Sequence, residues 1–220
     1  MTPLPYERAT WDDGAMSTAL VTGASSGIGL EIARVLGRNH DVVLAARGVD
    51  ALNALASELP NACVVAVDLA GHEGAQKLVA EVPEVDILVN NAGFGDWAPL
   101  AEADEEKLDD MIELNIRALT RLTRAYLPAM LARGSGHVLN VASTAAFQPG
   151  PLMAVYYASK AYVLSFSEAV AEETRGTGVS VTALCPGPTA SGSKPARRWR
   201  TARSSRAGSC RARQASRRTA

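Results

Sequence analysis

A tyrosine and a lysine four residues apart carry the clearest chemical pattern in this 220-residue sequence. Tyr156 and Lys160 lie on a predicted helix, and at this spacing both side chains leave the same helix face. A phenol titrates near pH 10, but a neighbouring ammonium favours the phenolate and lowers that pKa. Ser143 ends an apolar stretch 13 residues before the tyrosine, where a loop can fold its hydroxyl back toward the phenol. The three residues are candidates for acid–base chemistry, and the simpler interpretation is that Tyr156 and Lys160 are a helix pair that faces solvent.

A glycine-rich turn near the start of the chain is the second candidate site. It follows an apolar stretch at 18–21, precedes a helix-forming segment at 30–36, and contains Thr22, Gly23, Ser25, Ser26, Gly27, Ile28 and Gly29. Glycines let the backbone approach a pyrophosphate, and a helix N-terminus offers unpaired N–H groups to an anion. Any tight strand-to-helix connection can also use glycine, so the turn alone indicates only an anion site at a helix end.

The elements that must position these residues alternate regularly along the chain. Apolar stretches predict strands at residues 18–21, 42–46, 62–67, 86–89, 137–141 and 179–184. Helical spacing of apolar residues predicts further helices at 51–58, 73–81, 104–131 and 154–174. This alternation predicts an α/β fold, a single doubly wound parallel sheet with helices on both faces. Ligands of such folds bind at the carboxyl ends of the strands.

Four groups of residues, two of them partly described above, together match the motifs of a known protein family. The turn at 22–29 has the pattern TGxxxGxG, residues 90–93 read Asn-Asn-Ala-Gly, and residues 186–187 read Pro-Gly. Asn115, Ser143, Tyr156 and Lys160 follow in the same order and spacing as a known catalytic tetrad. Residues 17–188 therefore resemble the classical short-chain dehydrogenase/reductase family. The resemblance implies a Rossmann-type sheet of strand order 3-2-1-4-5-6, with the family's seventh strand missing because nothing beyond residue 191 resembles it.

The resemblance also implies a role for each residue in hydride transfer between a nicotinamide cofactor and a carbonyl or secondary alcohol. Tyr156 would donate a proton to the carbonyl oxygen, or remove it in reverse, while Ser143 polarises that oxygen. Lys160 would also bind the ribose hydroxyls, and Asn115 would hold a water in a proton relay. The other expected contacts are Asn90, Ala92 and Gly93 near the adenosine ribose, Pro186, Gly187 and Thr189 around the nicotinamide, and Phe147, Gln148, Pro149 and Met153 around the substrate.

Cofactor choice depends on the end of the second strand. A carboxylate there would bind the ribose hydroxyls and repel a 2′-phosphate, but this chain has Ala46 followed by Arg47. A guanidinium can bind the phosphate, so NADP(H) is expected in preference to NAD(H). Asp68 and Leu69 are expected beside the adenine. Simpler interpretations are that Arg47 is a solvated loop residue and that Asp68 only ends a strand.

The charge distribution divides the chain into three parts. Residues 189–220 contain ten basic residues and no acidic one, whereas residues 1–188 contain the other 12 basic residues and all 23 acidic residues. We expect a loose extension at 1–15, with Met16 as an alternative start, a catalytic domain at 16–188, and a basic, disordered tail at 189–220. The abrupt gain of Arg, Ser and Ala indicates a reading-frame shift, which would impair activity, with a genuine basic tail as the alternative.

Composition narrows the function classes. No apolar run reaches the ~18–20 residues of a membrane span, and no basic and apolar leader is present, so a cytoplasmic location is expected. Three separated cysteines and three separated histidines predict no metal site. The resemblance implies a small carbonyl or alcohol substrate. It also implies association through the helices at 104–132 and 154–174, where the missing strand favours a homodimer over a tetramer. Two other classes stay open: a non-catalytic NADP(H)-binding sensor or scaffold, and binding of nucleic acid or an acidic membrane surface by the tail.

Overall fold

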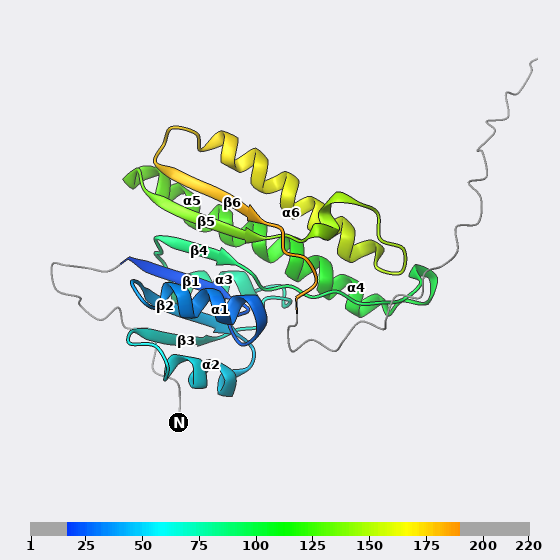
Figure 1. Cartoon of the computed structure of the whole chain (residues 1–220), viewed down its shortest axis with the longest axis horizontal. Coiled ribbons are helices and arrows are strands. Elements are labelled where there is room, and N and C mark those ends of the chain that lie inside the picture. Colours follow the sequence, from blue (N-terminus) through cyan, green and yellow to red (C-terminus); the bar gives the residue numbers. More distant parts are fainter. Residues whose placement is uncertain (1–16, 190–220) are drawn as a thin grey trace, which may run out of the picture.

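The computed structural model describes residues 17–189, which form one sheet flanked by helices (Figure 1). The expectations for residues 1–16 and 190–220, including the missing seventh strand, lie outside the described residues. The strands are β1 (Thr18–Thr22), β2 (Asp41–Ala46), β3 (Ala62–Ala66), β4 (Ile87–Asn90), β5 (Gly136–Val141) and β6 (Val179–Leu184). The helices are α1 (Gly27–Leu36), α2 (Val49–Ala56), α3 (Gly74–Glu81), α4 (Glu105–Ile112), α5 (Leu119–Arg133) and α6 (Ala154–Glu173), with short 3₁₀ turns at Leu100–Glu102 and Thr144–Phe147.

The sheet has the predicted strand order, β3-β2-β1-β4-β5-β6, and every neighbouring pair is parallel. In Figure 1 the strands follow one another from β3 at the bottom to β6 at the top. The order reverses beside β1, so the chain crosses from one half of the sheet to the other between β3 and β4. This reversal opens a crevice at the carboxyl ends of β1 and β4, where doubly wound folds bind their ligands.

Two apolar layers hold helices against opposite faces of the sheet. On one face, Ala33 of α1 and Leu52 and Leu55 of α2 pack against strand residues such as Leu44. On the other, α3 and α5 pack through residues such as Leu78 and Leu122 against β1, β2, β4 and β5. Helix α6 extends this second layer over β5 and β6. Burial on both faces explains why the strands are continuous apolar runs in the sequence.

The long helical region predicted over 104–131 is present, but its hydrogen-bond pattern changes partway along it. The structure has α4, then a π-helical segment at Glu113–Ala118, then α5. The other helices and strands agree with the predicted bounds to within three residues. Asn115 lies inside the π-helical segment, and its carboxamide forms two hydrogen bonds with the backbone of Phe94. Single π-helical turns within α-helices are frequent at functional sites, which makes this segment a candidate part of one.

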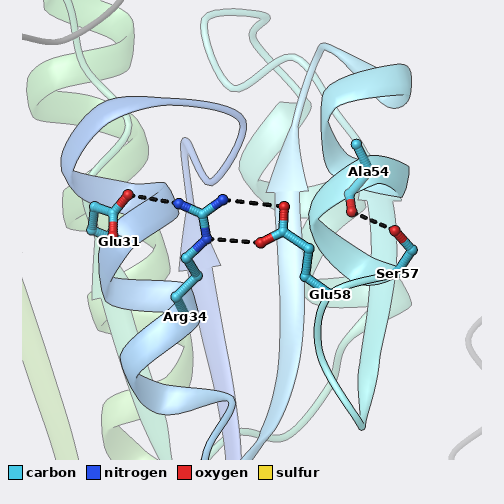
Figure 2. Close-up of polar contacts among 5 residues, drawn as sticks. All are labelled: Glu31, Arg34, Ala54, Ser57 and Glu58. Carbon is cyan, nitrogen blue, oxygen red and sulfur yellow. Dashed lines mark hydrogen bonds and ion pairs between the residues drawn. The ribbon is translucent and has the colours of Figure 1, made fainter.

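An arginine joins the two helices on one face of the sheet. Arg34 of α1 donates two hydrogen bonds to the carboxylate of Glu58, which follows α2, and a third to Glu31 one turn earlier (Figure 2). The bond from Arg34 lowers the pKa of Glu58. All three side chains are partly exposed, so this network adds little stability and mainly fixes how α1 and α2 lie together.

An apolar groove of about 680 Å³ runs between α1 and strands β4 and β5. The described residues leave it open, and Thr189, the last of them, lies on its lining. Its other lining residues are Gly27, Ile28, Glu31, Ile32, Val35, Leu36, Ile87, Val89 and Leu139. In the described part of the sheet β6 is the outer strand, bonded only to β5.

Within residues 17–189 no helix is both long and apolar enough to cross a lipid bilayer. The same part of the chain contains no group of three histidine, cysteine or acidic side chains placed to hold a metal ion.

Candidate active site

The start of α1 offers free N–H groups to an anion. No side chain of residues 17–189 caps this helix, because Ser26 occupies the N-cap position without bonding to the first turn. Gly27 has a φ of 58°, a left-handed conformation that favours glycine. Ser25 lies beside Gly48 in the loop after β2, and Ile28 points into the apolar groove. The turn therefore presents backbone donors and the positive end of a helix dipole toward the crevice.

Asn91 braces this turn against the end of β4. Its side-chain amide donates to the carbonyls of Thr22, at 2.9 Å, and Gly23, at 3.2 Å. The Thr22 hydroxyl donates to the Val89 carbonyl and accepts from the N–H groups of Asn91 and Ala92. Thr22 is thus buried and acts on the shape of the turn. Asn91 is not among the residues predicted to form the site, although its place in the Asn-Asn-Ala-Gly segment is a signal.

Asn90, the preceding residue, points the other way. Its amide donates to the Thr123 hydroxyl at 3.0 Å and to Asn140 at 2.9 Å, and Asn140 in turn donates to Ser167. Asn90 Oδ1 is buried without a hydrogen-bond partner among the described residues. The Asn90 side chain is therefore part of a buried polar cluster beneath the sheet, and it is not directed toward the expected ribose site.

The loop after β2 carries an accessible cation. Arg47 is 74% exposed in its side chain and lies 3.8 Å from the carboxylate of Asp68, which is itself 54% exposed. Asp68 also accepts from the N–H of Ala70, which fixes the turn after β3. An ion pair this exposed is weak, so the guanidinium is free to bind a stronger anion. Leu69 is buried in the core and does not reach the surface beside the adenine position expected for it.

Lys160 is buried next to Tyr156. Its side chain is directed at the end of β5, where the ammonium donates to the Val141 carbonyl at 2.7 Å, and the residue is only 6% exposed. The same ammonium lies 5.9 Å from the centre of the Tyr156 ring. Burial lowers the pKa of Lys160 from 10.5 to about 8, opposed in part by the nearby Cys185 thiol. A buried cation beside a phenol favours ionisation of that phenol.

This burial predicts a pH dependence of stability. Lys160 in the folded protein releases its proton near pH 8, whereas in the unfolded chain it holds it to about 10.5. The unfolded state therefore binds more protons between these values, and the free energy of unfolding rises with pH there, by up to about 3 kcal/mol. We expect Lys160→Met to be more stable than the parent protein at pH 7 and to lose this advantage by pH 10.5. Urea unfolding across that range measures the difference, and a difference independent of pH would refute the expectation.

Two glycines bring Asn115, Lys160 and Tyr156 to one place. A Cβ built on Gly93 would lie 2.9 Å from Asn115 Oδ1 and 3.5 Å from Lys160 Nζ. A Cβ built on Gly95 would lie 2.8 Å from Tyr156 Cδ2. The loop after β4 therefore passes directly against all three side chains. This close approach requires glycine at positions 93 and 95, because a Cβ at either would be too close to them.

Ser143 begins the loop after β5, and the Pro-Gly segment lies beside it. The Ser143 hydroxyl accepts from the N–H of Ala145 at 3.1 Å, which leaves its own proton free to be donated. The N–H of Thr144 donates to the Pro186 carbonyl at 3.0 Å. Gly187 and Thr189 follow at the surface. The 3₁₀ turn after Ser143 packs against α6, so Ser143, Pro186 and the helix of Tyr156 border the same crevice.

Apolar side chains surround the open side of Tyr156. A cavity of about 70 Å³ reaches the tyrosine between the loop at 96–103, α4 and the start of α6. Met153 touches the position of Gly95, and the Leu152 carbonyl accepts from the N–H of Ala98, which ties the two loops together. Phe147, Gln148 and Pro149 are exposed at the surface.

Comparison with known proteins agrees with this geometry. The model of the "short chain dehydrogenase" family matches residues 17–201. A putative ketoacyl reductase of Streptomyces coelicolor is 43% identical over 180 residues, which cover 77% of this chain and 69% of that protein. A short chain dehydrogenase of Pseudocercospora fijiensis is 41% identical over 182 residues, but the match spans only 59% of its length.

A solved structure gives the same result. The crystal structure of a metagenomic short-chain oxidoreductase in complex with NADP superposes with a TM-score of 0.72 at 38% identity, covering 80% of this chain and 84% of that one. Together with the sheet order and the residues gathered at its carboxyl edge, these matches show that the chain belongs to the short-chain dehydrogenase family of oxidoreductases.

Proposed function

We propose that this oxidoreductase transfers hydride between NADP(H) and a ketone or secondary alcohol, with Tyr156 as general acid and base. The observation that carries the proposal is the buried ammonium of Lys160 beside the Tyr156 ring. Its partner in the protein is a neutral carbonyl, so the positive charge is not cancelled by a carboxylate there. The charge is available to stabilise a phenolate.

Each of the four candidate catalytic residues has its own role in the reaction. When bound, the dinucleotide supplies or accepts the hydride. Tyr156 donates its phenolic proton to the carbonyl oxygen in reduction and takes it back in oxidation, and Lys160 stabilises the phenolate between these steps. The free proton of Ser143 is donated to the same oxygen, which polarises the carbonyl. Asn115 is held by the backbone of Phe94 and fixes the helix around the site.

The direct test is consumption of NADPH by the full chain with a panel of ketones and 3-oxo esters. Loss of the near-ultraviolet absorbance of NADPH that depends on the carbonyl compound supports the proposal. NADPH binding without turnover of any compound supports the sensor or scaffold alternative instead.

The proposed preference for NADP(H) rests on Arg47. No acidic side chain follows β2 at this point, and within residues 17–189 the guanidinium contacts only the exposed carboxylate of Asp68, at 3.8 Å. The glycine turn comes close to this loop, because a Cβ built on Gly48 would lie 3.9 Å from Ser25 Cβ. An arginine in this setting binds a phosphate through charge-assisted hydrogen bonds.

We therefore expect Arg47→Asp to raise the KM for NADPH about tenfold, since a hydrogen bond to a charged group contributes about 1.5–3 kcal/mol. The KM for NADH is expected to fall, because the new carboxylate accepts from the ribose hydroxyls. Steady-state kinetics with both cofactors measure the change. Arg38→Asp, at the opposite end of α1, is the matched control and should change neither value. Equal changes in the KM for NADPH and the KM for NADH would contradict the assignment of Arg47 to the 2′-phosphate.

A further inference from the structure

Ser159 is a buried residue that the proposed mechanism does not use. It lies on α6 between Tyr156 and Lys160 and is 0% exposed. A hydroxyl completely removed from water must have hydrogen-bond partners, and those of Ser159 belong to the active site.

Its two hydrogen bonds have a fixed direction. The Ser159 hydroxyl donates its only proton to the Tyr156 carbonyl at 2.7 Å. Its oxygen accepts from the side-chain amide of Asn115 at 3.0 Å. Both amide protons of Asn115 are then used, because the second goes to the Phe94 carbonyl at 2.9 Å, and its oxygen accepts from the Phe94 N–H at 3.1 Å. One chain of hydrogen bonds therefore joins the loop after β4, the π-helical segment and the first turn of α6.

The first turn of α6 depends on this link. Met153 occupies its N-cap position, and no side chain of the described residues caps the turn. Tyr156 lies within that turn. We propose that Ser159 is a positioning residue, which holds Tyr156 in its reactive orientation by fastening the start of α6 to Asn115. The inference rests on the proposed function, since it gives a role to Ser159 in the reaction that Tyr156 carries out.

The same helix supplies a matched control. Ser167 is 1% exposed, donates to the Val163 carbonyl at 2.6 Å and accepts from the amide of Asn140 at 2.9 Å. It thus makes the same two kinds of bond, eight residues further along α6 and away from Tyr156. Replacing either serine by alanine leaves one buried asparagine N–H without its acceptor, so both variants should lose stability.

The test compares Ser159→Ala, Ser167→Ala, Asn115→Ala and the double variant of Ser159 and Asn115. We expect Ser159→Ala to lower kcat about tenfold through misplacement of Tyr156, with the Kd for NADPH within twofold of the parent value. Ser167→Ala should lower the melting temperature to a similar extent and leave kcat within twofold. In the Asn115→Ala background the Ser159 substitution should cost little more, because the link is already broken. Equal loss of kcat in the two serine variants, or full additivity in the double variant, would overturn the proposal.

A second measurement does not depend on turnover. Hydrogen exchange of the peptide that covers residues 154–160 should become faster in Ser159→Ala and stay unchanged in Ser167→Ala. If Ser159→Ala exchanges faster but the parent protein reduces no carbonyl compound, the proposed function is refuted, while the link from Ser159 to the first turn of α6 stands. Unchanged exchange in an active enzyme would refute the positioning role alone.

Discussion

Tyr156→Phe is expected to lower kcat/KM by about 10³-fold, the largest effect of any single substitution in this chain. The variant lacks the proton that the phenol transfers, and loss of a general acid–base typically costs 10²–10⁴-fold. The ring and its 5.9 Å approach to Lys160 are unaffected by removal of one oxygen, so the fold and the affinity for NADPH should be preserved. Carbonyl-dependent NADPH oxidation gives the rate, and titration of NADPH fluorescence gives the affinity.

The neighbouring tyrosine is the control. Tyr157 has its ring 6.0 Å from that of Tyr156 and roughly perpendicular to it, and it packs against Gly150. Tyr157→Phe removes the same oxygen one residue away and should change kcat/KM by less than about threefold. A comparable loss in the two variants would show that the hydroxyl of Tyr156 has no special role.

Gly29→Ala is expected to weaken NADPH binding by about 100-fold, or about 2.7 kcal/mol. A Cβ at this position would lie 2.5 Å from the Gly23 carbonyl oxygen and even closer to the amide of Asn91. The Gly23 carbonyl is part of the backbone, and the Asn91 amide is fixed by two hydrogen bonds to the turn. Neither can easily move away from the new methyl group, so the first turn of α1 must shift. The strain should also cost about 1–3 kcal/mol of stability. Fluorescence titration with NADPH and urea unfolding measure the two effects.

Gly71→Ala is the matched control for this substitution. A Cβ there would make an ordinary contact, 3.4 Å from the Asp68 carbonyl. Binding and stability should both stay near the parent values. If Gly29→Ala still binds NADPH normally, α1 does not need its close approach to the turn, and the proposed pyrophosphate site is wrong.

The order of the sheet and the gathering of the chemical residues could be predicted from the sequence for clear physical reasons. Continuous apolar runs separated by helices allow few arrangements other than a doubly wound parallel sheet, and its carboxyl edge brings Asn115, Tyr156 and Lys160 together. The family and its oxidoreductase chemistry follow from the same motifs.

The sequence does not determine the directions of individual side chains, because these are set by tertiary contacts. Asn90 and Asn91 are chemically identical neighbours, but the first bonds to Asn140 in the core and the second to the glycine turn, and both partners are distant in the sequence. Leu69 is one residue past a surface carboxylate, yet it is buried. The role of Ser159 depends on a bond to Asn115, 44 residues earlier, which no local pattern reveals.

The π-helical segment has a consequence for the rotation of the helix about its own axis. Met111 in α4 and Met130 in α5 are both buried, at 1% and 0% exposure, and are 19 residues apart. At about 100° per residue, an unbroken α-helix would place the second about 100° beyond a whole number of turns from the first. A π-helical turn changes this angle, because it contains more residues than an α-helical turn. The segment that presents Asn115 thereby also sets the rotation of α5 relative to α4, so we expect a one-residue deletion within 113–118 to rotate one of these methionines away from its present contacts.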